Sequence, residues 1–250
     1  MLLFVALMAV GGLYAAVGGS GRAAAAQATD TSAVTEGRQL FLDGCSTCHG
    51  VNAAGTSYGP TLIGVGAAAV SFQVGTGRMP LAQPGAQAQR RDPQYTPEEI
   101  DALAAYIATL GPGPGIPTAE DLDTSQLTDD QIALGGKLFR TNCGACHNAA
   151  GAGGALSRGR YAPSLTESTS QHIWEAMLTG PENMPVFANT TLTPDDKRAI
   201  IGYIEKIRDQ PNPGGFALGR VGPVPEGAVL WVVGLGLLAG AAVWIGAKVS

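Results

Sequence analysis

The chain has 250 residues, with 15 Lys or Arg and 20 Asp or Glu, so its formal net charge is −5. Because only 14% of the residues are charged and acids are in excess, the composition excludes a protein that binds nucleic acid through its phosphates. A hydrophobic content of 45% excludes a disordered chain, and the length predicts one or two domains.

Residues 1–21 carry no charged side chain. At a helical rise of about 1.5 Å per residue, such a run spans about 31 Å, the thickness of a bilayer core. It predicts an N-terminal transmembrane helix or signal anchor, or the apolar part of a secretory signal cleaved at residues 24–26 or 26–28. In each case we expect the chain that follows to be exported.

The middle of the chain contains an internal duplication. Each copy has, in the same order, a Phe, a Cys-x-x-Cys-His motif, a Tyr-x-Pro-x-Leu segment, a Met-Pro pair and a Thr-Pro pair followed by two acids. These features begin at Phe41, Cys45, Tyr58, Met79 and Thr96 in the first copy, and at Phe139, Cys143, Tyr161, Met184 and Thr193 in the second. The repeat predicts two tandem domains, over residues 35–110 and 126–210.

Each copy is expected to end in a helix, with Thr as the N-cap, Pro at the first helical position and acids in the first turn. Apolar residues then recur at the spacing of one helix face. They are Leu103, Tyr106, Ile107 and Leu110 in the first copy, and Ile200, Tyr203, Ile204 and Ile207 in the second. Between the copies, residues 111–125 are rich in Pro, Gly and acids, which predicts a stiff, solvated spacer without an element of its own.

The motif that indicates chemistry is Cys-x-x-Cys-His, the attachment motif of c-type haem. It occurs as Cys45, Cys48 and His49, and again as Cys143, Cys146 and His147. Two thiols one helical turn apart suit the two vinyl groups of one porphyrin, and the adjacent imidazole can then reach the iron. The sequence therefore predicts two covalently bound haem c groups.

Three other uses of these cysteines fit the sequence less well. One zinc ion shared by both Cys-x-x-Cys pairs would leave the repeated Met-Pro and Tyr-x-Pro segments without a purpose. A thioredoxin-type dithiol is expected in a βαβ context, which the pattern lacks. A disulfide across two residues is strained. Haem attachment is therefore the favoured interpretation.

The second axial ligand of each iron follows from counting residues. The chain has three histidines, and His49 and His147 are already used, so two bis-histidine haems are excluded. Met79 and Met184 are each followed by Pro at matching places in the two copies. We therefore predict His49 with Met79 on haem 1 and His147 with Met184 on haem 2, a ligation that raises the reduction potential.

Four further residues receive supporting or structural roles. The carbonyls of Pro60 and Pro163 are predicted to accept the second ring N–H of the ligating histidines, although a simple turn proline is the alternative. Met177 has no counterpart in the first copy and is expected in the core of a helix face. His172 is expected at the surface or as a capping residue.

Residues 227–247 form a second uncharged run, with Trp231 and Trp244 near its two ends. Length and aromatic positions predict a C-terminal transmembrane helix rather than a buried core helix. Glu226 precedes the run and Lys248 follows it, so the positive-inside rule places the C-terminus in the cytoplasm. The expected location is a cell membrane, crossed more than once, with the domains on the extracytoplasmic side.

Each copy resembles a class I cytochrome c domain, a mainly α fold in which an N-terminal helix crosses a C-terminal one. The Gly-x-x-x-Phe segments Gly37–Phe41 and Gly135–Phe139, with Tyr106 and Tyr203, match the residues of that helix crossing. The resemblance implies a mainly α chain of two tandem cytochrome c domains with transmembrane helices at the C-terminus and at the N-terminus.

The whole layout resembles the dihaem cytochrome c subunit of actinobacterial menaquinol–cytochrome c reductases, the cytochrome cc family. The resemblance implies a subunit that accepts single electrons from a Rieske iron–sulfur protein, beside a cytochrome b subunit, and passes them to the CuA site of an oxidase in a supercomplex. With both irons closed by His and Met, we expect no catalysis by this chain alone.

Three alternatives stay open at this point. A high-affinity haem–copper oxidase or a membrane dehydrogenase can also carry a dihaem subunit, although the C-terminal helix argues against both. A dihaem peroxidase needs one open iron, against which the Met in each copy argues.

Overall fold

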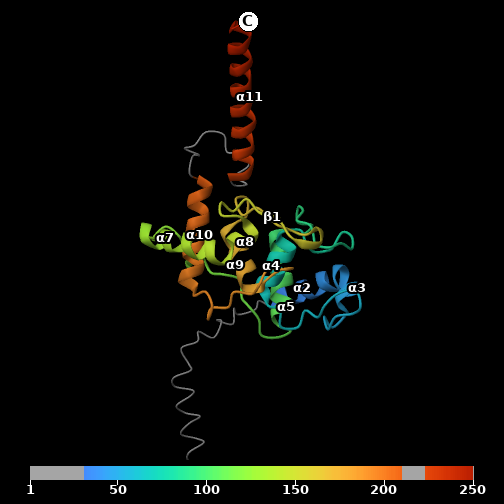
Figure 1. Ribbon diagram of the computed structural model, residues 1–250. Coiled ribbons are helices and arrows are strands. Elements are labelled where there is room, and N and C mark those ends of the chain that lie inside the picture. Colours follow the sequence, from blue (N-terminus) through green and yellow to red (C-terminus); the bar gives the residue numbers. More distant parts are fainter. Residues whose placement is uncertain (1–30, 210–222, 250) are drawn as a thin grey trace, which may run out of the picture. The chain divides into compact units, whose positions relative to one another are not determined.

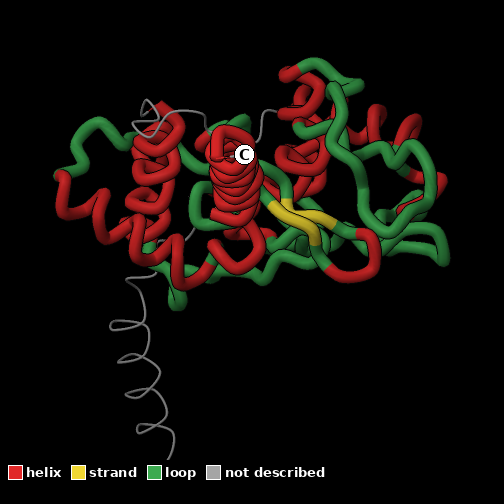
Figure 2. Tube along the Cα trace, turned by 45° about the horizontal axis from the view of Figure 1, so that its top comes forward, coloured by secondary structure: helices red, strands yellow, loops and turns green. Residues whose placement is uncertain are grey.

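The computed structural model describes residues 31–209 and 223–249, and within this part the chain is mainly helical. Figure 2 shows the helices, together with one pair of short strands. The elements are α2 (Thr31–Gly44), α3 (Ser46–His49), α4 (Ala67–Gly75), α5 (Pro97–Ala108), α6 (Ala119–Leu122), α7 (Asp129–Asn142), α8 (Gly144–His147), β1 (Gly154–Ala155), the 3-10 helix η1 (Ser157–Gly159), β2 (Tyr161–Ala162), α9 (Ser170–Thr179), α10 (Pro194–Asp209) and α11 (Pro223–Val249). The expected N-terminal helix over residues 1–21 lies outside the described residues.

The chain divides into two compact units. Among the described residues, the first contains 31–70 together with Tyr95–Gly115, and the second contains Ser71–Gln94 together with those from Ile116 onward. Each unit is built around one pair of long helices, α2 with α5 and α7 with α10 (Figure 1). The mainly α expectation is confirmed.

In the first unit, α2 and α5 cross where glycine removes the side chain. A Cβ atom placed on Gly37 would overlap the carbonyl oxygen of Ala102, so only glycine permits this approach. One turn further along α2, Phe41 is buried against Tyr106, with ring centroids 5.5 Å apart. Tilted aromatic pairs at this distance add stabilisation beyond the area that they bury.

The second unit repeats the same crossing with α7 and α10. A Cβ on Gly135 would overlap the carbonyl oxygen of Ala199. Phe139 and Tyr203 have ring centroids 5.5 Å apart, as in the first copy. The helix crossing expected from the Gly-x-x-x-Phe segments is therefore confirmed in both copies.

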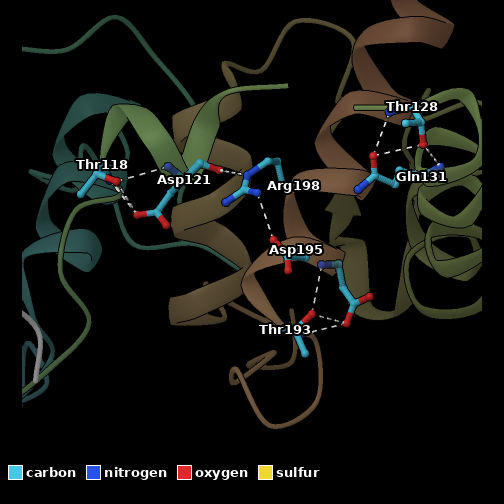
Figure 3. A network of polar contacts seen from close by, with 8 residues as sticks. Thr118, Asp121, Thr128, Gln131, Thr193, Asp195 and Arg198 are labelled. Atoms are coloured by element: carbon cyan, nitrogen blue, oxygen red, sulfur yellow. Dashed lines mark hydrogen bonds and ion pairs between the residues drawn. The ribbon is translucent and has the colours of Figure 1, made fainter. Parts of the chain in front are cut away.

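The helix starts use one device repeatedly (Figure 3). The Thr128 hydroxyl accepts from the backbone N–H of Gln131, whose side chain accepts from the Thr128 N–H, and this capping box starts α7. Thr193 and Asp196 make the same exchange before Pro194, the first residue of α10. Thr96 does so before α5, so both predicted N-caps and both prolines at the first helical position are confirmed.

The segment between the copies is not a plain spacer. Within the residues expected as a linker, Thr118 and Asp121 form a capping box that starts the short helix α6. Arg198 of α10 donates from Nε to the Asp121 carbonyl at 3.4 Å and pairs with Asp195 at 3.0 Å (Figure 3). The prediction of no element over 111–125 is therefore wrong at α6, because a threonine and an acid three residues apart were enough to start a turn.

The second unit also includes a segment that the repeat would place in the first domain. Gln87 donates to the carbonyl of Tyr161 at 2.9 Å and accepts from its backbone N–H at 3.0 Å. The N–H of Ala88 donates to the Glu182 carboxylate at 3.0 Å. These bonds explain why Ser71–Gln94 packs with the second unit, although the repeat predicted one domain over 35–110.

Helix α11 is the long helix of the described part that has no buried residue. Its apolar window, Glu226–Lys248, has a mean hydropathy of 2.3, and none of it is buried. Trp231 and Trp244 are 67% and 63% exposed. By length and composition α11 can cross a membrane, and a surface this apolar on a soluble protein would be costly.

Candidate functional site

The second Cys-x-x-Cys-His motif forms one helical turn directly after α7. Cys143 is the C-cap of α7, and its backbone N–H donates to the Phe139 carbonyl at 2.8 Å. The N–H of His147 donates back to the Cys143 carbonyl at 2.9 Å, which closes the turn. This turn therefore presents two thiols and one imidazole from a rigid element.

Burial controls the ionisation of this motif. Cys143 is buried and Cys146 is exposed. Burial, and after it the neighbouring Cys146, raise the pKa of the Cys143 thiol to about 11. The neutral thiol is therefore the stable form at neutral pH, and a permanent thioether would remove this titration altogether.

The imidazole of His147 is oriented by the Tyr-x-Pro segment of the same copy. Its Nδ1 lies 2.9 Å from the carbonyl oxygen of Pro163. A carbonyl only accepts, so Nδ1 carries the proton and Nε2 has a free lone pair. Burial lowers the pKa of His147, while the bond to Pro163 acts in the opposite direction, and the neutral ligand form is favoured.

These groups line one cavity within the second unit. Cys143, Cys146, His147, Pro163 and Met184 all contribute to its wall. The rest of the wall is largely apolar and comes from the core of the unit, including Phe139, Ile173, Met177, Phe187, Ile200 and Ile204. The structure thus brings together every residue that the sequence assigned to the second site.

The first motif has the same local geometry. The N–H of His49 donates to the Cys45 carbonyl at 3.0 Å, and His49 Nδ1 lies 2.8 Å from the Pro60 carbonyl oxygen. Cys45 is half-buried, and burial raises the pKa of its thiol, with a smaller contribution from Cys48. The attachment turn and its supporting carbonyl are therefore present in both copies.

Met79 is placed differently from its counterpart Met184. Its backbone N–H donates to the Gln73 carbonyl at 2.9 Å, and its side chain is half-buried. It belongs to the segment Ser71–Gln94, which packs with the second unit, whereas His49 belongs to the first. The pairing of Met79 with His49 on one iron stays a prediction.

The structure corrects one assignment and confirms another. Met177 is 2% exposed in the core of the second unit, as expected. His172 was expected at the surface or as a cap, but its half-buried side chain lines the cavity, with its ring edge against Phe72 at 6.1 Å between centroids. Only its backbone N–H takes part in a cap, by donating to Thr169.

Sequence reasoning also missed three arginines in the cavity wall. The three are Arg78, Arg90 and Arg160. Glu182 is the one carboxylate among the described lining residues. None of the three arginines belongs to a motif. Arg78 stands where the second copy has Asn183, so the repeat itself gave no signal for a cation at this place.

The donor set fits a covalently attached haem. Two thiols and a neutral imidazole share one turn, a thioether lies in the same apolar cavity, and cations line part of its wall. Within the described residues no cluster of three or more His, Cys, Asp or Glu suits a metal ion bound by side chains alone.

Comparison with known proteins agrees with this geometry. Residues 34–111 match the family model described as cytochrome c, and residues 130–204 match that of subunit III of cbb3-type cytochrome c oxidase. Cytochrome c domains carry covalently bound haem c. The chain is thus a mainly helical protein of two cytochrome c domains with a C-terminal apolar helix.

Relatives that match nearly the whole chain identify its family more specifically than the two domain models. The cytochrome bc1 complex cytochrome c subunit of Mycobacterium tuberculosis is 45% identical over 251 residues, covering 99% of this chain and 90% of the relative. That of Corynebacterium efficiens is 44% identical over 260 residues, covering 99% and 88%. The cbb3-type cytochrome c oxidase subunit FixP of Bradyrhizobium diazoefficiens is 29% identical over 56% of this chain and 45% of its own length. The chain belongs to the family of cytochrome bc1 complex cytochrome c subunits.

Proposed function

We propose that this chain is a membrane-anchored dihaem electron-transfer subunit of a respiratory quinol–cytochrome c reductase. The observation that carries the proposal is the repetition of one geometry: in each copy, a Cys-x-x-Cys-His turn follows a helix, and a proline carbonyl holds the histidine ring. Two such turns support two haem c groups, attached at Cys45 and Cys48 and at Cys143 and Cys146.

Different residues of each copy would attach the haem, ligate its iron and orient the ligating histidine. The cysteines tether it, and His49 or His147 supplies an Nε2 lone pair on a ring that Pro60 or Pro163 orients. Met79 and Met184 would each supply a thioether ligand to the iron. When bound, each haem supplies a one-electron iron couple, and His/Met ligation favours the reduced state.

This ligation explains why the chain should move electrons without bond chemistry. An iron that is closed on both faces by protein ligands has no open position for a substrate. The part of the wall of the second cavity that comes from the core, with residues such as Phe139, Ile173 and Ile204, offers no polar side chain to water. The same closure argues against a dihaem peroxidase, which needs one open iron.

The partners follow from the family. Relatives named as subunits of a cytochrome bc1 complex support a cytochrome b subunit and a Rieske iron–sulfur subunit as neighbours. We propose that electrons enter from the Rieske protein, which a menaquinol-oxidising complex reduces, and leave to the CuA site of an oxidase in a supercomplex. The match of residues 130–204 to an oxidase subunit model supports an oxidase as the acceptor.

The membrane arrangement rests on α11. Its exposed apolar surface and its flanking Glu226 and Lys248 support a single crossing with the C-terminus in the cytoplasm and the haem domains outside. The ammonium group of Lys248 lies 4.9 Å from the centre of the Trp244 ring, a cation–π pair. Lysine and tryptophan are typical of a membrane interface. An N-terminal crossing over residues 1–21 would make the protein multi-pass.

A second candidate function is a dihaem subunit of a cbb3-type oxidase, favoured by the similarity to FixP. That similarity covers 56% of this chain, whereas the bc1 complex subunits cover 99%. The reductase is therefore the better supported complex.

The experiment that separates the two uses the native complex. A C-terminal tag on this chain allows gentle solubilisation and purification from its own membranes, followed by a reduced-minus-oxidised spectrum. Haem b and haem a bands beside haem c, with quinol-driven oxygen uptake, are expected. A mock purification from the untagged strain is the control. Haem b and haem c with oxygen uptake but without quinol oxidation would indicate the cbb3-type oxidase, and haem c alone, or haem c with a dehydrogenase, would also contradict the reductase.

A further inference from the structure

Arg78 is a buried cation that forms no ion pair within the described residues, although Glu182 lies close enough to act on it electrostatically. Its side chain is 6% exposed, and its guanidinium carbon lies 4.9 Å from the centre of the Phe72 ring. Within the described residues the ion pairs are Arg198–Asp195 and Lys206–Asp129, and neither pair lines the cavity. A buried charge is costly unless an opposite charge or hydrogen bonds compensate it.

The cavity that Arg78 lines has an excess of positive charge. Arg90 and Arg160 also line it, and Glu182 is the one carboxylate among the described lining residues. The Glu182 carboxylate already accepts from the backbone N–H of Ala88. The wall therefore suits a ligand that brings negative charge.

The other two arginines are already engaged with protein oxygens. Arg160 donates from Nε to the carbonyl of Ala86 and from Nη1 to the Asn183 side chain, both at 2.8 Å. Arg90 donates to the Glu167 carbonyl at 3.4 Å. Arg78 makes no such bond within the described part of the chain, so all of its donors are left for a ligand, whereas Arg90 and Arg160 have only some of theirs left.

A haem attached at Cys143 and Cys146 would bring two propionate carboxylates into this cavity. We infer that Arg78 is a haem-binding residue of the second domain, whose guanidinium pairs with a propionate of that haem. This inference rests on the proposed function, since it needs a haem in the second cavity. It assigns a residue of the first copy of the repeat to the haem of the second copy.

The packing of the segment explains how a residue of one copy serves the other. Residues Ser71–Gln94 belong to the second unit. The side-chain amide of Gln87 holds them there, because it hydrogen-bonds both the carbonyl and the N–H of Tyr161. Arg78 is followed in the chain by Met79, the proposed ligand of the first haem.

The test is a potentiometric titration of the full-length chain in its purified complex. Arg78→Leu should lower the reduction potential of the second haem, because a nearby cation stabilises the reduced iron. The pH range over which that potential varies should also move upward, since an unpaired propionate protonates at higher pH. Arg78→Lys keeps the charge and should restore most of the potential.

Two further variants make the readout specific. Arg140→Leu removes the same charge from an exposed position of α7 that does not line the cavity, and it should leave both potentials unchanged. Met184→His lowers the reduction potential of the second haem, so that this potential can be told apart from that of the first haem and is called the marked potential. Arg78→Leu in that background should move the marked potential and leave the other in place.

The outcomes separate cleanly. A shift confined to the unmarked haem would overturn the inference, because Arg78 would then act through Met79. No shift, with two haems still attached, would overturn it as well. If Met184→His moves neither potential, the ligand set of the proposed function fails. The propionate bending bands in resonance Raman spectra then still decide about Arg78, because they change in Arg78→Leu only if a propionate loses a hydrogen-bonding cation.

Discussion

Gly135 and Ala199 are in backbone contact where α7 and α10 cross, and a Cβ on the glycine would occupy the position of the alanine carbonyl oxygen. Gly37 and Ala102 repeat this relationship in the first unit. The attachment turns follow α7 and α2 directly, so each crossing fixes where the thiols and the imidazole stand.

We predict that Gly135→Ala destabilises the second domain, because the helices must separate to admit one methyl group. The expected loss is about 1–3 kcal/mol of unfolding free energy, the usual range for overpacking. Thermal unfolding of the full chain, followed by circular dichroism and by haem absorbance, measures it. Gly144→Ala is the control, since its Cβ would lie 3.8 Å from the Phe139 carbonyl oxygen and the first copy has Ser46 there. Equal stability of the two variants would contradict the prediction.

Met184→His is predicted to keep the second haem attached while lowering its reduction potential, because imidazole replaces a thioether that favours reduced iron. A redox titration followed at the haem bands measures the change. Met177→Leu is the matched control, as a buried methionine of the same cavity that is assigned to the core. An unchanged potential in Met184→His, or an equal fall in both variants, would rule Met184 out as the ligand.

The double variant Cys45→Ala/Cys48→Ala is predicted to lose one of the two haems of the chain, because no thiol is left to form a thioether in the first copy. The pyridine haemochrome spectrum, referred to protein concentration, counts the haems. Thr47→Ala changes an exposed residue between the two cysteines and should keep the full haem content. Retention of both haems by the double variant would refute attachment at this motif.

Lys197 predicts a pH dependence of stability. It is fully buried and donates from Nζ to Asn189 at 2.8 Å and to the Leu192 carbonyl at 2.7 Å. Burial lowers the pKa of Lys197 from 10.5 to about 8, against a smaller opposite effect of Asp196. Between these two pH values the unfolded chain holds a proton that the native chain has lost, so this lysine makes the native state more stable as the pH rises through that window.

The measurement compares unfolding midpoints in urea at several pH values between about 8 and 10. Lys197→Met should lack the increase with pH that the unmodified chain shows. Lys137→Met, which removes an exposed lysine of α7, should keep it. An identical pH profile in all three chains would show that Lys197 does not titrate in this range.

Much of the fold and of the second site could be predicted from the residues because the relevant physics is local. One turn of helix sets the spacing of Cys143, Cys146 and His147, and a threonine with an acid three residues later caps a helix wherever it stands. The duplication supports each motif independently, since a feature that occurs twice in the same order is rarely accidental. The same local rule, overlooked in the linker, accounts for α6.

Other features depended on contacts between residues distant in the chain. Periodicity could not show that residues 71–94 pack with the second copy, because that placement depends on bonds such as those between Gln87 and Tyr161. Nor could it show that His172 and Arg78 line the second cavity, since neither belongs to a motif. Sequence alone thus determined the two Cys-x-x-Cys-His turns, the helix pairs and the apolar C-terminal helix, all of which follow from local spacing and hydrophobicity. The tertiary structure decided which charges surround the second cavity, because burial and pairing of a side chain depend on what the folded chain brings against it.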